Sequence, residues 1–263
     1  MIDTHTHLYD SQFDADREAV MTRALQAGVS RMLLPNIDAS TVSPMLALCR
    51  RYEGVCHPML GLHPTSVDAT FGQQTEYLAQ HLNDSRIAAI GETGIDLYRD
   101  RQYVGEQIEA FRIHIGWAKQ YRLPLVIHCR NAYREITEEI KREQDGTLTG
   151  VFHCFPGDVQ QAGEVTAMGF MLGIGGVVTY KNADMARVVQ CIDIHHILIE
   201  TDAPYLPPVP HRGKRNESTY LYHIVQAIAA LKSMPEEEVI RYTTANAMRT
   251  FPKIANNNIT DNK

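Results

Sequence analysis

The sequence predicts a single α/β domain with the architecture of a (β/α)8 TIM barrel. Eight short β-rich segments alternate with helical segments along the chain, and such alternation favours a parallel sheet. Eight strands are enough to close a barrel, 263 residues suit one domain of this kind, and no shift in composition divides the chain. A doubly wound open sheet is the alternative. That fold usually carries a glycine-rich turn after its first strand, and residues 8–16 contain no glycine.

The individual elements follow from hydrophobic periodicity and from turn residues. Strands are expected at residues 2–7, 31–35, 57–63, 86–92, 124–129, 150–155, 169–175 and 196–202. Helices are expected at residues 13–27, 41–51, 73–82, 103–121, 131–143, 158–167, 183–191, 217–231 and 235–249. Gly28 is a typical helix stop, and Pro124 separates a helix from the strand after it. We assign residues 1–255 to the barrel and the polar residues 256–263 to a frayed C-terminal tail.

The composition excludes several classes of protein. The formal net charge of −6 gives no overall basic surface, so a nucleic acid would have to be held by a local patch. Five cysteines, an odd number without a Cys-x-x-Cys pair, disfavour a disulfide framework and a thiolate zinc site. We see no signal peptide, no apolar run of membrane-spanning length and no sign of an obligate protein partner. These features predict a cytoplasmic protein.

Side chains that can bind a metal ion stand at the ends of most expected strands. His5-Thr6-His7 ends the first strand, and in a strand residues i and i+2 point to one face. In a barrel the carboxyl ends of the strands meet where active sites are built. Buried imidazoles and carboxylates need partners, which a metal centre supplies. The expected metal ligands are His5, His7, Glu92, His128, His153 and Asp202.

Six donors are too many for one open catalytic ion, so we expect two divalent ions about 3.5–4 Å apart, with Glu92 bridging them. Nitrogen and oxygen donors without sulfur suit Zn, Mg or Mn and disfavour a closed structural zinc site. Such a pair lowers the pKa of a bound water, whose proton Asp202 accepts. Asp202 and Glu92 are therefore the expected catalytic residues. Glu200 shares the strand parity of Asp202, and we interpret it as an acid that lines the interior.

Several cations follow the same strand ends and are expected to contact the substrate. They are His63, Arg130, Arg212, Lys214 and Arg215, the last three within the loop 211–216. A basic loop is usually a solvated surface, but its place after the last strand favours substrate contact here. Tyr205 either stacks on a base or packs the loop, and Asp96 either steadies a ligand or caps a turn. The histidines His57, His81, His114, His195, His196 and His223 are assigned no chemistry.

Motifs along nearly the whole chain resemble one family. They are Ile2-Asp3-Thr4-His5-Thr6-His7-Leu8, Gly61-Leu62-His63-Pro64, Gly91-Glu92-Thr93-Gly94-Ile95-Asp96, His128-Cys129-Arg130-Asn131-Ala132, His153-Cys154-Phe155, Glu200-Thr201-Asp202-Ala203-Pro204-Tyr205-Leu206 and Arg212-Gly213-Lys214-Arg215-Asn216-Glu217. The chain resembles the TatD family of metal-dependent deoxyribonucleases, within the amidohydrolase-like TIM-barrel superfamily. The resemblance implies a (β/α)8 barrel, a divalent-metal centre on the same six ligands, and a substrate-side role for His63. Pro156 and Ser218 depart from the family pattern, which has serine and proline there.

The function expected on these grounds is a divalent-metal-dependent deoxyribonuclease. It would cleave the phosphodiester bonds of DNA or a short oligonucleotide by a metal-activated water, with Asp202 as base. The negative charge and short loops favour an exonuclease-like action on single strands or ends. One alternative is hydrolysis of another ester, a lactone or an amide, for example an aminoacyl-tRNA ester, because fold does not choose among these bonds. A non-catalytic metal-binding scaffold is disfavoured because the full set of acids and imidazoles is present.

Overall fold

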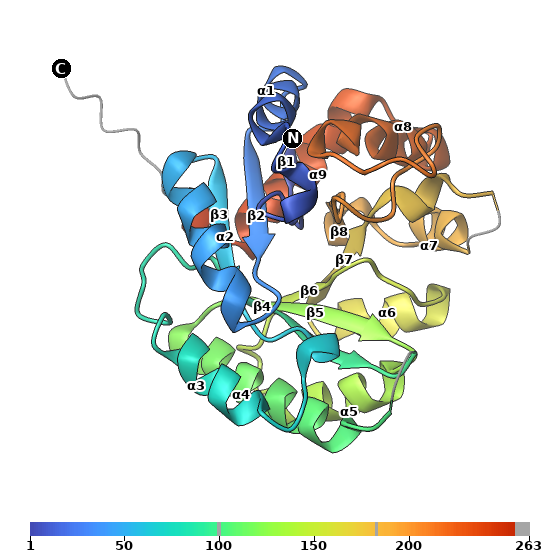
Figure 1. The fold of residues 1–263 in the computed structure, drawn as a ribbon. Helices are drawn as coiled ribbons and strands as arrows, with labels where there is room; N and C mark the ends of the chain where they lie inside the picture. The colour runs from blue at the N-terminus through green and yellow to red at the C-terminus, as the bar shows by residue number, and fades with distance from the viewer. Residues whose placement is uncertain (99–100, 182–183, 256–263) are drawn as a thin grey trace.

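The computed structural model describes residues 1–98, 101–181 and 184–255, and it has the predicted barrel architecture. Eight parallel strands form one sheet in the order β1 to β8, and the helices surround it (Figure 1). The strands are β1 (Ile2–Asp3), β2 (Arg31–Pro35), β3 (Cys56–Leu60), β4 (Ala89–Asp96), β5 (Leu125–Arg130), β6 (Gly150–Phe152), β7 (Phe170–Ile174) and β8 (Ile197–Ile199). All eight overlap predicted strands; several are shorter, whereas β4 begins later than predicted and continues past the predicted end at residue 92.

Nine of the helices overlap the predicted ones, and the short last one was not predicted. The helices are α1 (Arg17–Gln26), α2 (Ala39–Arg51), α3 (Phe71–Ala79), α4 (Val104–Tyr121), α5 (Tyr133–Glu143), α6 (Val159–Ala167), α7 (Met185–Cys191), α8 (Leu221–Lys232), α9 (Glu236–Thr250) and the short α10 (Pro252–Ala255). The first begins later than predicted because residues Ser11–Phe13 form a separate 3-10 turn, η1, capped by Asp10. Residue 183 and the predicted tail 256–263 lie outside the described residues, so the division at residue 255 stays a prediction. No helix in the described ranges is long and apolar enough to cross a membrane.

The barrel closes between β8 and β1 through an irregular segment. The first strand was predicted to reach residue 7 but ends at Asp3. Beyond it, the Thr4 amide donates to the carbonyl of Ile199 at 3.1 Å, and the His7 amide donates to the carbonyl of Ala203 at 2.7 Å. The carboxylate of Asp3 accepts hydrogen bonds from the Thr201 amide and hydroxyl at 3.0 and 2.6 Å. These bonds fix the segment that carries His5 and His7 without a regular ladder.

The interior of the barrel is apolar at one end only. Each strand contributes one residue to a buried inner cluster, made of Ile2, Leu33, Met59, Ala89, Val126, Val151, Met171 and Leu198. Phe251 and Ile254 pack against this cluster. Asn246 in α9 donates to the carbonyls of Ile194 and Ile197, so α9 covers the amino-terminal end of the barrel. The opposite end is left to polar side chains.

Two kinds of backbone bring those polar side chains inward. His128 within β5, His153 directly after β6 and Glu200 directly after β8 come two residues after the inner-cluster residues of these strands, as strand alternation requires. In β4 the register with β5 shifts between Ile90 and Thr93. Glu92 lies within this irregular stretch, so alternation alone does not determine its direction.

Candidate metal centre

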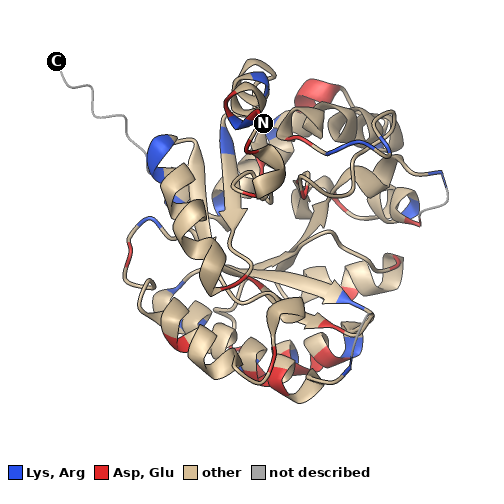
Figure 2. Ribbon diagram, viewed as in Figure 1, with Lys and Arg blue, Asp and Glu red and all other residues tan. Residues whose placement is uncertain are grey.

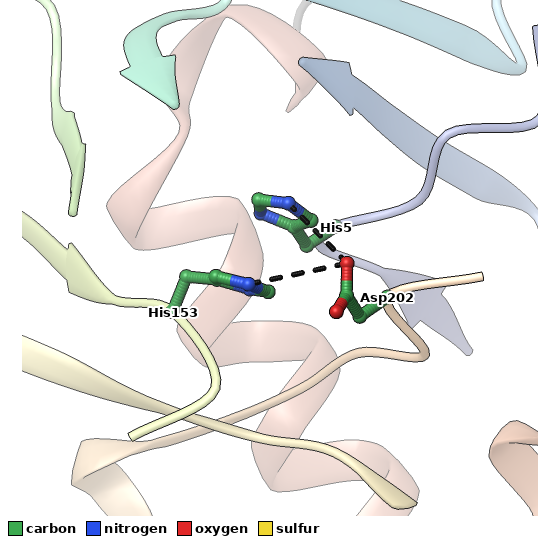
Figure 3. A group of neighbouring side chains, drawn as sticks. All are labelled: His5, His153 and Asp202. Atoms are coloured by element: carbon green, nitrogen blue, oxygen red, sulfur yellow. Dashed lines mark ion pairs between the residues drawn. The ribbon is translucent and has the colours of Figure 1, made fainter. Parts of the chain in front are cut away.

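Glu92 lies at the middle of the polar end of the barrel and is 2% exposed. Its Oε2 atom is 3.0 Å from Nε2 of His5 and 3.8 Å from Nε2 of His7. Oδ1 of Asp202 lies 3.5 Å from Nε2 of His7, 3.9 Å from that of His5 and 4.0 Å from that of His153. Figure 3 shows the rings of His5 and His153 pointing toward the Asp202 carboxylate. One carboxylate oxygen of Glu92 therefore faces the β1 side of the centre.

The other oxygen of Glu92 faces the opposite side. Its Oε1 atom lies 2.8 Å from Nδ1 of His128, 3.3 Å from Nε2 of His63 and 3.7 Å from Nε2 of His153. The six residues predicted as metal ligands thus come together around one carboxylate, and His63 joins them. A carboxylate with a different set of imidazoles at each oxygen has the geometry of a bridging ligand.

The arrangement suits divalent cations. Three groups have candidate ligand atoms within 4.8 Å of one another: His5 with His153 and Asp202, His5 with His7 and Glu92, and His63 with Glu92 and His128. His5 is fully buried, and neither of its ring nitrogens has a hydrogen-bond partner of good geometry among the described residues. Its ring stacks on His153, with centroids 3.5 Å apart. Burying an imidazole with unpaired nitrogens is unfavourable, and a coordinated cation would offset this.

The tautomer of His7 is fixed by a neighbouring tyrosine. The Tyr9 hydroxyl donates to the carbonyl of Pro35 at 2.7 Å, so it accepts the bond from Nδ1 of His7 at 3.1 Å. The proton therefore sits on Nδ1, and the lone pair of Nε2 points to Glu92 and Asp202. Sequence reasoning missed Tyr9. Its only sequence signal is its position two residues after His7.

His63 has the opposite tautomer. The backbone amide of Thr65 donates to Nδ1 of His63 at 3.2 Å, so in the neutral ring the proton is on Nε2. This N–H faces Oε1 of Glu92. Burial lowers the pKa of His63, which keeps the ring neutral. Because Nε2 of His63 carries a proton, it is better suited to donate a hydrogen bond to a substrate oxygen than to bind a metal cation.

His128 and His153 are each supported by a separate buried carboxylate. Nε2 of His128 lies 3.0 Å from Oδ2 of Asp96, whose other oxygen accepts the Tyr98 amide at 2.9 Å. Asp96 thus caps the turn and holds His128. Nδ1 of His153 lies 2.9 Å from Oε1 of Glu200. A carboxylate behind a histidine fixes its ring for metal binding.

The strand β7 supplies space at the centre, and no donor. A side chain at Gly173 would place its Cβ 2.4 Å from Oε2 of Glu200. Glu200 itself is fully buried, and Oε1 also accepts the Cys154 amide at 2.5 Å. The glycine therefore makes room for the acid that supports His153.

The charges of the centre shift its pKa values strongly. Burial raises the pKa of Glu92, but the neighbouring imidazoles of His63, His5 and His153 outweigh burial and hold it well below its usual range. The same balance lowers the pKa of Asp202. Burial lowers the pKa of His5. Burial also lowers the pKa of His153, but the charges of Glu200 and Glu92 outweigh burial and raise this pKa to about 10. Both carboxylates are therefore ionised at neutral pH.

Comparison with known proteins places this centre in a family. The family model for TatD-related DNases matches residues 2–252. The chain belongs to the TatD-related DNase family. Membership confirms the family predicted from the motifs and the enzyme class, a metal-dependent hydrolase acting on ester bonds, and it agrees with hydrolysis of DNA.

Individual relatives of the TatD-related chain cover almost its full length. It is 36% identical over 252 residues to the Bacillus subtilis protein named "Uncharacterized metal-dependent hydrolase YabD", covering 95% of this chain and 98% of the relative. It is 33% identical over 261 residues to the "3'-5' ssDNA/RNA exonuclease TatD" of Cronobacter sakazakii, covering 97% and 99%. The crystal structure of YjjV, a TatD homologue from Escherichia coli, superimposes with a TM-score of 0.90 at 29% identity, covering 96% and 98%.

The predicted substrate-side cations of this TatD-related chain divide into two groups. Figure 2 shows basic residues at the end of β5 and on the loop between β8 and α8. The guanidinium of Arg130 lies 4.0 Å from the ring centroid of Tyr98, and that of Arg212 lies 4.4 Å from the ring centroid of Tyr180. Lys214 is exposed. These three cations are open to a ligand.

Arg215 has a different environment. Its guanidinium forms two hydrogen bonds to the carboxylate of Asp16, at 2.8 and 2.7 Å, and one to the carbonyl of Gln12 at 2.7 Å. It also lies 4.4 Å from the ring centroid of Phe13. Arg215 therefore fastens the loop to η1 and α1, and we leave it out of the proposed substrate contacts. The contact with Asp16 spans 199 residues, so no local pattern in the sequence indicates it.

Proposed function

We propose that this protein is a divalent-metal-dependent exonuclease that cleaves phosphodiester bonds at the ends of single-stranded DNA. The observation that carries the proposal is the position of Glu92. Its two oxygens face two sets of imidazoles, with His5 and His7 on one side and His128 and His153 on the other. A shared carboxylate between two donor sets is the arrangement used for two-ion phosphoryl transfer.

In the proposed site His5, His7 and Asp202 would hold one ion and His128 and His153 the other, with the Glu92 carboxylate between the two donor sets. Bound ions would supply Lewis acidity that activates a water and offsets charge on the phosphoryl oxygens. The donor set suits zinc in the purified protein, with Mg or Mn as the working ions.

Asp202 is the proposed proton acceptor. Burial raises its pKa, but the hydrogen bond from His7 and the charge of His153 outweigh burial and lower it, so Asp202 is ionised at neutral pH. A group of this acidity accepts a proton only from a water that is itself acidified. The Nε2–H of neutral His63 donates to a phosphoryl oxygen in the same scheme, which stabilises the charge that grows there in the transition state.

The substrate is proposed from charge and from the relatives. Arg130, Arg212 and Lys214 give the metal-bearing face local positive charge in a chain whose formal net charge is −6. Relatives of 30 to 33% identity are named 3'-5' ssDNA/RNA exonucleases, which supports 3'-5' action on single strands.

The test compares DNA with other bonds under metal control. Purified protein is assayed for metal content and for EDTA-sensitive hydrolysis of 3'-labelled and 5'-labelled single-stranded DNA, beside panels of carboxylic esters, lactones and amides. We expect metal-dependent shortening of the DNA from its 3' end. Metal-dependent hydrolysis of an ester or amide with intact DNA would reject the nuclease. Full DNA cleavage after removal of all metal would reject the metal centre.

A further inference from the structure

Exposed apolar side chains gather on the face that carries the metal centre. Among the described residues the large exposed ones are Leu25, Tyr77, Tyr98, Tyr205, Leu206, Val209 and Tyr222. Four of these seven follow β4 or β8, at the carboxyl ends of the strands. Exposed aromatic groups beside cations are typical of surfaces that bind the bases and phosphates of single strands.

Tyr205 lies on the β1 side of the centre. Its ring centroid is 6.1 Å from that of His7, with the rings nearly perpendicular at 68°, and it is 45% exposed. Its backbone is held by a bond from its amide to the carbonyl of Asp202 at 2.8 Å and by a bond from the buried side chain of Asn216 to its carbonyl at 2.6 Å. The backbone that carries the ring is therefore held in place, and the ring is an open surface beside His7.

Tyr98 lies on the other side. It is 59% exposed, and its amide donates to Asp96, which in turn holds His128 at 3.0 Å. The guanidinium of Arg130 covers its ring at 4.0 Å. In the ring of eight strands β4 and β5 lie opposite β8 and β1 (Figure 1). Tyr205 and the Tyr98–Arg130 pair therefore flank the centre from opposite sides.

We propose that Tyr205 and the Tyr98–Arg130 pair are two base-stacking positions on either side of the metal centre, which accept the bases that flank the cleaved phosphodiester. The proposal rests on the proposed function and names the residues that would make the enzyme prefer a single strand to a duplex. Two separate stacking surfaces pull neighbouring bases apart, which a single strand allows and a base-paired duplex resists. Arg130 adds a guanidinium plane to stack on and a charge for the adjacent phosphate.

The experiment uses the full-length, metal-loaded protein with Tyr98→Ala, Tyr205→Ala and the corresponding phenylalanine variants. Tyr222→Ala is the matched control, because Tyr222 is also 45% exposed but lies in α8 near Glu236 of α9. Each variant is assayed on a short single-stranded DNA, on a blunt duplex of the same sequence, and on methyl p-nitrophenyl phosphate, a phosphodiester without bases.

We expect each alanine variant to raise KM for single-stranded DNA about tenfold, since stacking on an aromatic side chain contributes about 1–3 kcal/mol per base. The preference for single strands over duplex should fall, the phenylalanine variants should stay near wild type, and the small phosphodiester should be unaffected. If alanine prevents folding, Tyr98→Leu and Tyr205→Leu replace it, because leucine keeps apolar bulk without an aromatic face.

The stacking proposal is overturned if the alanine or leucine variants match Tyr222→Ala on single-stranded DNA while the wild type cleaves that DNA. It is equally overturned if the small phosphodiester loses as much activity as the DNA, because the tyrosines would then support the centre itself. A wild type that cleaves the small phosphodiester but no DNA would instead reject the proposed nuclease function. The two failures are therefore distinguishable.

Discussion

The histidines on the two sides of the centre differ in what holds their second ring nitrogen. On the side of β5 and β6, a buried carboxylate lies behind each ring: Asp96 at 3.0 Å from His128 and Glu200 at 2.9 Å from His153. On the side of β1, His7 is held by the hydroxyl of Tyr9. Nδ1 of His5 has no hydrogen-bond partner among the described residues; Nδ1 of His153 also makes none of good geometry, but the charge of Glu200 lies beside it.

This difference separates the pKa values of similar rings. Burial lowers the pKa of His5, whereas the acids behind the rings outweigh burial and raise the pKa of His128 and of His153. The β1 side therefore offers lone pairs to a cation at neutral pH. On the side of β5 and β6 a cation must first displace protons from His128 and His153. These rings are then more basic, and therefore stronger, ligands.

The largest effect is expected at Asp202, which touches histidines of both sides. Asp202→Asn keeps an oxygen donor but cannot accept a proton. Turnover should fall by about 10² to 10⁴-fold, the usual contribution of a general base, while the metal content measured by emission spectrometry stays near that of wild type. Glu92→Gln is the contrasting variant and should lose metal as well. An Asp202→Asn enzyme with undiminished turnover would show that another group takes the proton.

The second prediction tests the carboxylate supports directly. Asp96→Asn and Glu200→Gln should each weaken zinc binding about tenfold to a hundredfold, the usual effect of removing such a support. Tyr9→Phe should weaken it less, because it removes a neutral partner from His7. Competition with a chromophoric chelator measures the affinities. If Tyr9→Phe and Glu200→Gln lower the zinc affinity equally, the support on the β1 side would be as strong as the support on the side of β5 and β6, contrary to the difference in histidine pKa values.

The third prediction concerns pH. The pKa of His153 is raised to about 10 in the fold. Its protonation therefore stabilises the metal-free protein fully at pH values below about 6.5, the usual pKa of histidine. This stabilisation is lost as the pH rises through about 10. An entering cation displaces that proton, so zinc affinity should increase with pH by up to about tenfold per unit over this window. The same titration with Glu200→Gln should level off at lower pH. A wild-type affinity that is flat across the window would contradict the raised pKa.

Strand alternation explains how much of the centre could be predicted. His128, His153 and Glu200 follow the inner residues of their strands by two positions, so parity alone directs them inward. The strand pattern therefore predicted the inward direction of these three side chains, whereas metal binding by His128 and His153 stays a prediction. His5 and His7 were predicted from their spacing in an expected strand, and Glu92 from its place at an expected strand end. Irregular backbone places all three instead, after β1 ends at Asp3 and where β4 shifts its register.

The supporting contacts could not be predicted because they join distant segments. The hydroxyl of Tyr9 donates to the carbonyl of Pro35 and therefore accepts from His7. Hydrogen bonds to Asp16 hold the guanidinium of Arg215 away from the substrate. The exposed face could not be predicted either, because Tyr98 and Arg130 meet only when β4 and β5 pair. Sequence thus indicated the chemistry of the donors and Tyr205 as a stacking candidate, whereas the tautomers and the Tyr98–Arg130 pair required coordinates.

The last prediction concerns His114, a buried histidine with no carboxylate and no cation among its hydrogen-bond partners in the described residues. Its Nε2 accepts the Leu62 amide at 3.0 Å, next to His63, and its Nδ1 bonds the carbonyl of Ala110 at 2.5 Å. Burial lowers its pKa to about 4. A depressed pKa stabilises the fold above the usual value near 6.5, and this stability is lost as the pH falls toward about 4.

The free energy of unfolding should therefore decrease by at most about 1.4 kcal/mol per pH unit on account of His114 between about pH 6.5 and 4. His114→Gln keeps an acceptor for the Leu62 amide but cannot gain a charge. Urea denaturation of metal-free protein at several pH values should give a shallower acid dependence for this variant than for wild type. Parallel curves would mean that protonation of His114 does not limit acid stability. A shallower curve would extend the contrast of the centre, because His114 would then behave as His5 does, a ring whose pKa is lowered by burial.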